Sequence, residues 1–129
     1  MSALKDSLSV GIGGVLGSLL RYLAEQAAPH LPGAALDILA VNLVGAYAIG
    51  LLMEMFFQRA HTSPRMRLAA TTGLLGGFTT FGTMMGQVAA LGRAGFLVSA
   101  TAIGVGEPLA GVLATLLGLG TAGVLLRRL

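Results

Sequence analysis

Long apolar runs separated by short polar connections dominate the pattern of hydrophobic and polar positions along the chain. The runs cover about residues 8–28, 38–57, 68–91 and 95–126. A helix needs about 20 residues to cross roughly 30 Å of hydrocarbon, and each run is long enough. The pattern therefore predicts an all-α membrane protein in which residues 1–129 form a single domain of four transmembrane helices.

The composition agrees with a place in the bilayer. Hydrophobic residues make up 55% of the 129 positions and charged residues only 10%, whereas a soluble domain has about 25% charged residues. A chain this short has too much surface for its volume to hide so many apolar side chains from water. It has no cysteine, which excludes a disulfide scaffold and a thiol nucleophile. His30 and His61 fall in predicted loops without companion ligands, so they predict no metal site.

The basic residues are too few and too scattered for a nucleic-acid interface, and they indicate an orientation instead. Four spans would place both ends of the chain on one side of the membrane. The basic residues predicted on that side are Lys5, Arg59, Arg65, Arg67, Arg127 and Arg128. The other side has Arg93 and, near the end of its span, Arg21. This asymmetry favours a cytoplasmic location for both ends.

The spacing of small residues predicts close helix packing in three of the spans. These residues form the pairs Gly13-x-x-x-Gly17, Ala46-x-x-x-Gly50 and Ala114-x-x-x-Gly118, which let helix backbones approach in lipid. The third span differs, because residues 71–86 hold five glycines and five threonines. This density predicts a broken helix at mid-membrane. Its freed carbonyls would be tolerated only inside protein or beside a polar cavity, where they are potential cation ligands.

Three polar side chains within the spans each allow two interpretations. Asn42 is either a structural hydrogen-bonding group between helices or a donor that lines an ion path. Arg21 either reaches the interface and caps carbonyls, or attracts an anion toward a vestibule. Glu107, which precedes Pro108, is either a functional carboxylate inside the membrane or part of a helix start, where both residue types are favoured.

Three sequence blocks resemble the Fluc/CrcB fluoride channels. The blocks are GGVLGSLLRY at 13–22, VNLVG at 41–45 followed by Gly50, and TTGLLGGFTTF at 71–81. Their order and spacing match essentially the whole chain. The third block is the most specific, since a generic membrane helix would not carry it.

The resemblance implies an antiparallel, dual-topology dimer with two pores, in the plasma (inner) membrane of a prokaryote. It implies a structural sodium ion on the dimer axis, held by the backbone carbonyls of Gly76 and Thr79. The residues implied along the ion pathway are Arg21, Asn42, Phe81, Thr83, Met84 and Thr115. Such a chain would be a passive channel that exports cytoplasmic fluoride, with fluoride, a second subunit and lipid as its partners, and not an enzyme.

The chain departs from the family pattern at several of these positions. Met84 occupies the second aromatic position, Gly82 and Gly111 stand where serine is usual, and Gln87 replaces a glutamate. A thioether donates no hydrogen bond, so Met84 predicts a weaker anion site than phenylalanine. The charge asymmetry also favours one orientation of the chain. The second subunit is therefore either another copy or a paired homologue of opposite orientation.

Two other classes share this pattern of spans. A small multidrug-type proton-coupled exporter needs a carboxylate deep in the first span, where this chain has only Glu25 near the end, so Glu107 would have to substitute. A structural membrane subunit without transport would use its glycines and Asn42 for packing alone. No P-loop motif is present and no base–nucleophile pair can be assembled, so neither an ATP-driven pump nor an enzyme is predicted.

Overall fold

The computed structural model describes residues 2–27, 34–58 and 62–127, and all regular structure in these ranges is helical. The elements are α1 (Ser2–Ala27), α2 (Ala34–Gln58), α3 (Pro64–Leu68), the π-helical segment η1 (Ala69–Leu75), α4 (Gly76–Phe78), α5 (Phe81–Arg93) and α6 (Leu97–Leu126). Several predictions lie outside the described residues, namely those made for His30, Arg59, His61 and Arg128.

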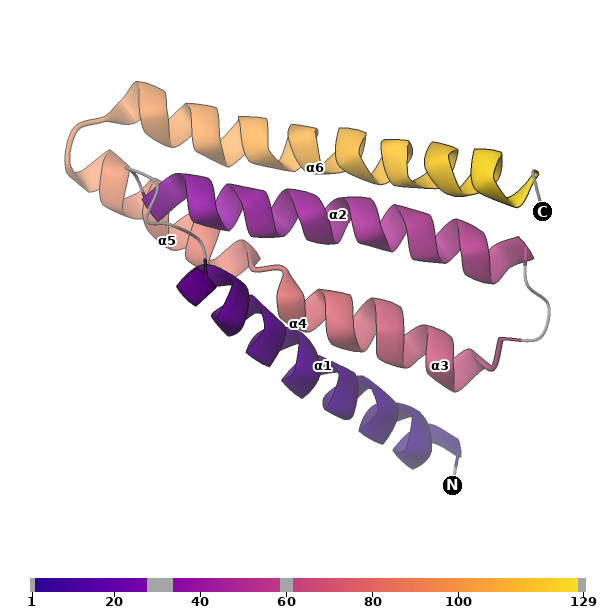
Figure 1. The fold of residues 1–129 in the computed structure, drawn as a ribbon. Coiled ribbons are helices and arrows are strands. Elements are labelled where there is room, and N and C mark those ends of the chain that lie inside the picture. Colours follow the sequence, from indigo (N-terminus) through magenta and orange to yellow (C-terminus); the bar gives the residue numbers. More distant parts are fainter. Residues whose placement is uncertain (1, 28–33, 59–61, 128–129) are drawn as a thin grey trace.

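The helices run back and forth as adjacent passes, which are formed by α1, α2, the succession from α3 to α5, and α6 (Figure 1). Of the helices in the described ranges, α1, α2 and α6 are each long and apolar enough to cross a membrane. The other pass is assembled from α3, η1, α4 and α5 in succession. The start of α1 and the end of α6 lie at the same end of the molecule (Figure 1), as an even number of passes requires.

The long helices pack through glycines, because a larger residue would collide with a neighbouring backbone. A Cβ atom on Gly13 would meet the carbonyl oxygen of Ala69 in η1, and one on Gly17 would meet that of Leu74. The glycine pair predicted in the first span therefore does pack α1 against η1.

Helix α2 lies along α6 in the same way. A Cβ atom on Gly50 would meet the carbonyl oxygen of Thr115, and one on Gly118 would meet that of Tyr47. Each helix thus contributes a glycine to a contact between backbones. The small-residue pairs predicted in the second and fourth spans are confirmed as packing sites through these two members.

Glycines in the third pass also serve packing. A Cβ atom on Gly77 would meet the carbonyl oxygen of Gly14, and one on Gly73 would lie 2.7 Å from that of Val10. Helical geometry is lost just after these glycines: Thr79 (φ −79°, ψ 155°) and Thr80 (φ −141°, ψ 104°) are extended between α4 and α5. The residues that leave the helix are therefore threonines.

Helix α6 is continuous across Glu107 and Pro108. The interpretation of this pair as a helix start is wrong. The helix begins ten residues earlier, after Gly95, whose φ of 85° is a left-handed conformation that suits glycine and allows the chain to reverse after α5. Proline is tolerated inside a membrane helix because neighbouring groups satisfy the freed carbonyl. Glu107 therefore lies near the middle of the helix.

Charged groups gather toward the ends of the passes. Asp6 in α1 and Arg65 in α3 form an ion pair of 3.0 Å, at the end of the molecule where α6 finishes, whereas α5 ends with Arg93 at the opposite end (Figure 1). Between these ends the single chain exposes many large apolar side chains, among them Leu19, Leu109 and Leu117. A soluble monomer rarely exposes so much apolar surface, so this surface is suited to lipid or to another subunit.

Candidate functional site

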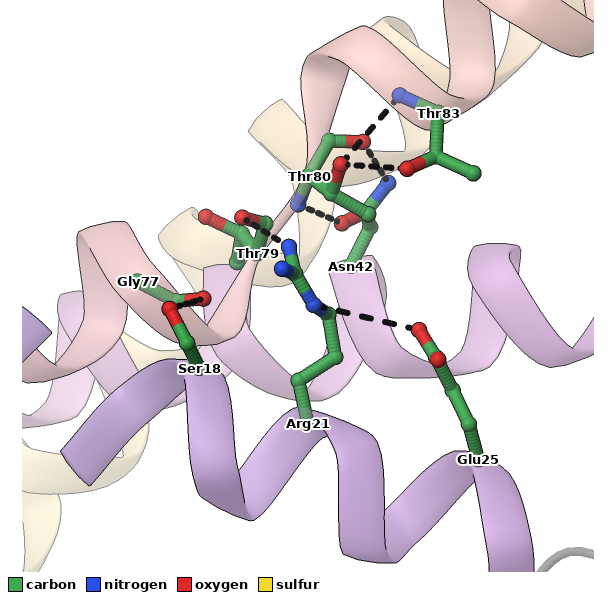
Figure 2. Close-up of polar contacts among 8 residues, drawn as sticks. All are labelled: Ser18, Arg21, Glu25, Asn42, Gly77, Thr79, Thr80 and Thr83. Atoms are coloured by element: carbon green, nitrogen blue, oxygen red, sulfur yellow. Dashed lines mark hydrogen bonds and ion pairs between the residues drawn. The ribbon is translucent and has the colours of Figure 1, made fainter. Parts of the chain in front are cut away.

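The extended segment between α4 and α5 is held by a side-chain amide from α2. Asn42 Nδ2 donates to the Thr80 carbonyl oxygen at 3.2 Å, and the Thr80 N–H donates to Asn42 Oδ1 at 2.7 Å (Figure 2). One amide thus satisfies both backbone groups of Thr80. In an uninterrupted helix that N–H would bind the carbonyl of residue 76, so the amide replaces a helical hydrogen bond.

Thr80 also begins the next helix. Its Oγ1 accepts a hydrogen bond from the Thr83 N–H at 3.2 Å and lies 2.8 Å from the Thr83 hydroxyl. This is the N-cap arrangement that threonine favours, in which a side-chain oxygen satisfies an unpaired N–H of the first turn. Thr80 was not among the residues selected from the sequence. The signal available was a threonine three residues before another, at the point where the helix was expected to break.

Helix α1 supplies donors to the carbonyls on the other side of this segment. Arg21 Nη1 donates to the Thr79 carbonyl oxygen at 3.4 Å, and Ser18 Oγ donates to that of Gly77 at the same distance (Figure 2). Arg21 Nε also lies 3.8 Å from Glu25 Oε1, one turn further along α1. The carbonyl-capping interpretation of Arg21 is therefore confirmed, and Ser18 is an additional capping group.

The second partner of Asn42 is Glu107 of α6. Its side chain is buried, with 7% relative exposure, and Oε1 accepts a hydrogen bond from Asn42 Nδ2. A side-chain amide has two N–H donors, and those of Asn42 are directed to Thr80 and Glu107. Asn42 consequently joins three passes, as the structural interpretation predicted. The sequence showed two polar residues within separate apolar runs but did not indicate that they pair.

A groove of about 820 Å³ runs beside these contacts. Its walls come from α2, α6, η1 and the segment from α4 into α5, and most of the lining is apolar. The predicted site residues that line it are Asn42, Gly76, Thr79, Phe81, Met84 and Thr115. Arg21 and Thr83 are not among the lining residues. Phe81 is 68% exposed in the single chain, whereas Met84 is 2% exposed.

Thr115 faces the backbone of α2 at the groove. Its hydroxyl lies 3.0 Å from the Ala46 carbonyl oxygen and 3.0 Å from that of Gly111, one turn earlier in α6. A hydroxyl has a single hydrogen to donate, so these two oxygens share it. The Thr115 hydroxyl stabilises the contact between α2 and α6 in this conformation. It would have to rotate to donate to an ion.

The two predicted sodium ligands, the carbonyl groups of Gly76 and Thr79, have different surroundings. The Thr80 N–H binds Asn42, which leaves the Gly76 carbonyl without its helical donor. Sodium is a hard cation that carbonyl oxygens of unwound backbone can coordinate. The described residues contain no group of three or more acidic, histidine or cysteine side chains suited to a metal. The Thr79 carbonyl fits less simply, because the cationic Arg21 already donates to it.

Comparison with known proteins identifies the family. The sequence model described as "CrcB-like protein, Camphor Resistance (CrcB)" matches residues 8–119. The chain belongs to the CrcB family. The resemblance found in the sequence blocks is therefore confirmed, and the matched residues include the groove, the extended segment and both hydrogen-bond partners of Asn42, Thr80 and Glu107.

Relatives from several bacteria are named "Fluoride-specific ion channel FluC". The protein of Chlorobaculum tepidum is 41% identical over 127 residues, which cover 98% of this chain and 97% of the relative. That of Rhizobium leguminosarum is 40% identical over 86% of this chain and 93% of the relative. That of Pseudomonas paraeruginosa is 41% identical over 89% of this chain and 91% of the relative. These matches span nearly the full length of the relatives.

Proposed function

We propose that this chain is a subunit of a fluoride-selective channel through which the anion leaves the cytoplasm passively. Membership of the CrcB family and the names of its relatives support fluoride as the ion. The structural observation that carries the proposal is the groove, where Phe81 and Asn42 meet beside the extended segment. An exposed aromatic ring and a half-buried amide thus line the same groove.

The chemistry of the groove suits a small anion. Fluoride is firmly hydrated, so a selective path must replace its water with close partners. The edge of the Phe81 ring carries partial positive charge, and amide or hydroxyl groups supply hydrogen bonds. Several weak sites of this kind favour passage over trapping. An inside-negative potential would drive the anion outward with about 2.3 kcal/mol per 100 mV.

The complete pore requires a second subunit in this proposal. The third pass would cross the membrane as a broken helix, and an antiparallel partner would cover the open side of the groove. Phe81 is exposed in the single chain, and a Cβ on Gly76 or Gly82 would meet nothing, so this surface has room for a neighbour. A sodium ion held by the carbonyls of Gly76 and Thr79 would supply a fixed positive charge near the anion path.

Ion flux from liposomes tests the proposal. Purified protein is reconstituted with internal potassium fluoride, valinomycin sets the potential, and a fluoride electrode records efflux. We expect rapid loss of fluoride, and a parallel experiment with chloride should give the rate of protein-free liposomes. Equal release of both anions, or no release of fluoride, would overturn the channel proposal.

A substitution at Phe81 tests the site. Phe81→Ile keeps an apolar side chain and removes the ring edge, so fluoride efflux should fall at least tenfold while the oligomer on a sizing column is unchanged. The matched control is Phe57→Ile, because Phe57 is also exposed but lies at the end of α2, outside the groove lining. Equal effects of the two substitutions would contradict the role given to Phe81.

One observation favours a second candidate, the proton-coupled exporter. Glu107 is a buried carboxyl group that lines the groove, which such an exporter would need. The same liposomes with an acidic interior and a fluorescent organic cation outside distinguish the two functions. Cation uptake that dissipates the proton gradient, without fluoride efflux, would establish the exporter in place of the channel.

A further inference from the structure

Glu107 is the one ionisable side chain among the described residues that line the groove. It is buried in the middle of α6, and its carboxyl group binds the amide that the proposed pathway uses. None of the family blocks recognised in the sequence includes it. The charge of a buried carboxyl group that lines the groove affects directly whether an anion can enter the groove.

The hydrogen bonds of the Asn42 amide leave it no unoccupied N–H that could bind an anion. Of the two N–H groups of Asn42, one donates to the Thr80 carbonyl and the other to Glu107 Oε1. The amide oxygen accepts from the Thr80 N–H. The contacts to Thr80 hold the backbone in place, so the N–H directed to Glu107 is the one that fluoride must gain.

We propose that the protonation state of Glu107 controls the anion site at Asn42. An ionised carboxylate only accepts hydrogen bonds. It therefore holds the Asn42 N–H that does not bind Thr80, and its negative charge repels fluoride from the groove. A neutral carboxyl group has an O–H to donate. In that form it is a weaker acceptor for the Asn42 N–H, so fluoride can compete for this donor, and the carboxyl O–H becomes a second donor to the anion. This inference rests on the proposed fluoride pathway and adds a residue to it.

No other charged side chain on the described elements around Glu107 lines the groove and could take the place of this proton. Within α6 it is the only ionisable residue, and η1 and α4 contain none. On α5 the ionisable side chain is Arg93, in the last turn, and on α2 they are Asp37, Tyr47 and Glu54, none of which lines the groove. Arg21 of α1 donates to the Thr79 carbonyl and pairs with Glu25, and it too is outside the lining.

Competition for one N–H makes proton and anion binding mutually dependent. Fluoride and the carboxylate are both acceptors for the same donor, and two negative charges repel strongly where little water intervenes. Fluoride binding must therefore favour proton uptake at Glu107, and proton uptake must favour fluoride by the same factor. A carboxyl group that only braced the helices would show no such coupling.

Proton uptake by the purified protein tests this coupling without requiring conduction. Sodium fluoride is added to wild-type protein in weakly buffered detergent solution, and the pH is recorded against the same addition of sodium chloride. We expect uptake of up to one proton per chain with fluoride and none with chloride. Glu107→Gln should abolish the uptake, and Glu54→Gln, a carboxyl group of α2 outside the groove, should leave it intact.

Fluoride efflux at different pH gives the second measurement. Wild-type efflux above the protein-free leak should fall as pH rises, by up to about tenfold per pH unit if one proton is required. Glu107→Gln should conduct at a rate independent of pH, because its neutral amide can donate to the anion at any pH.

The outcomes separate this inference from the proposed function. Efflux without proton uptake, or the same pH dependence in wild type and Glu107→Gln, overturns the role of Glu107 and leaves the channel in place. Fluoride-dependent proton uptake without efflux overturns the channel and retains the proton-linked anion site. If Glu107→Gln fails to fold, the wild-type comparison of fluoride with chloride decides the question alone.

Discussion

Asn42 satisfies both backbone polar groups of Thr80 with one side-chain amide, from a helix 38 residues away in sequence. Main-chain hydrogen bonding is nearly obligatory in lipid. The amide takes the place of the missing partners at Thr80, and Arg21 donates to the Thr79 carbonyl. The position of the interruption is therefore determined as much by α2 as by the third pass itself.

Replacing Asn42 should destabilise the interruption. Asn42→Ala removes both bonds to Thr80 and the bond to Glu107, which costs about 1–3 kcal/mol where buried groups lose their partners. We expect a lower thermal unfolding midpoint in detergent, together with loss of fluoride efflux. Gln58→Ala is the control, because that amide is exposed at the end of α2. A midpoint shift as large in the control would show that the effect does not depend on Thr80.

Arg21 and Glu25 should differ in their effects although they are paired. Arg21→Ala removes a donor to the Thr79 carbonyl and should reduce both stability and fluoride efflux. Glu25→Ala removes only a partly exposed ion pair of 3.8 Å, and such pairs contribute about 0–1 kcal/mol. Efflux and unfolding of both variants are measured side by side. The capping role is refuted if the two substitutions behave alike.

Glycines at backbone contacts should tolerate no side chain. Gly17→Ala forces a Cβ into the Leu74 carbonyl, and overpacking of this kind costs about 1–3 kcal/mol or more. The same change at Gly120, where a Cβ meets nothing, should leave the unfolding midpoint unchanged or slightly higher. Detergent-solubilised yield and thermal unfolding provide the comparison. Similar losses at both positions would argue against close packing of α1.

Met84 should limit how strongly the groove holds an anion. Met84→Phe adds a ring edge beside the groove, so half-saturation of efflux should occur at lower fluoride concentration and the maximal rate should fall. The side chain is almost fully buried, and the larger ring should also cost about 1–3 kcal/mol of stability. Efflux over a series of fluoride concentrations measures the first effect. An unchanged half-saturation would place Met84 outside the pathway.

The orientation of the chain can be read from tags on its two ends. The start of α1 and the end of α6 lie at one end of the molecule, so tags on both should share a side. When the chain is expressed alone, tags accessible from both faces of the membrane would support a dual-topology homodimer. Tags confined to the cytoplasm would instead require a paired homologue of opposite orientation.

The sequence predicted the positions of the long helices well, because the length and apolar character of a run determine where a membrane-spanning helix forms. The bounds of the runs at 38–57 and 95–126 lie within four residues of those of α2 and α6. Glu107 was harder to interpret, since a proline beside an acidic residue is typical of a helix start. In the structure, α6 starts just after the turn at Gly95, which has a positive φ. Pro108 lies inside this continuous helix.

The interruption itself was only partly predictable. The density of glycine around residues 73–77 suggested a weak helix, but Gly73 and Gly77 approach the backbone of α1. The extended residues are Thr79 and Thr80, because Asn42 and Arg21 provide partners at those two positions. Such long-range contacts leave no periodic signal within the third run. The pairing of Asn42 with Glu107 is of the same kind.

Backbone contact through glycines divides the molecule into two tightly packed units. One unit is α1 with η1 and α4, and the other is α2 with α6 and α5. Thr79 and Thr80 connect α4 of the first unit to α5 of the second, and the side chain of Asn42 from α2 binds Thr80 at the same point. Within each unit, the glycine contacts hold α1 against η1 and α4, and α2 against α6. A change in the width of the groove that keeps these contacts would displace one unit against the other at the two extended threonines.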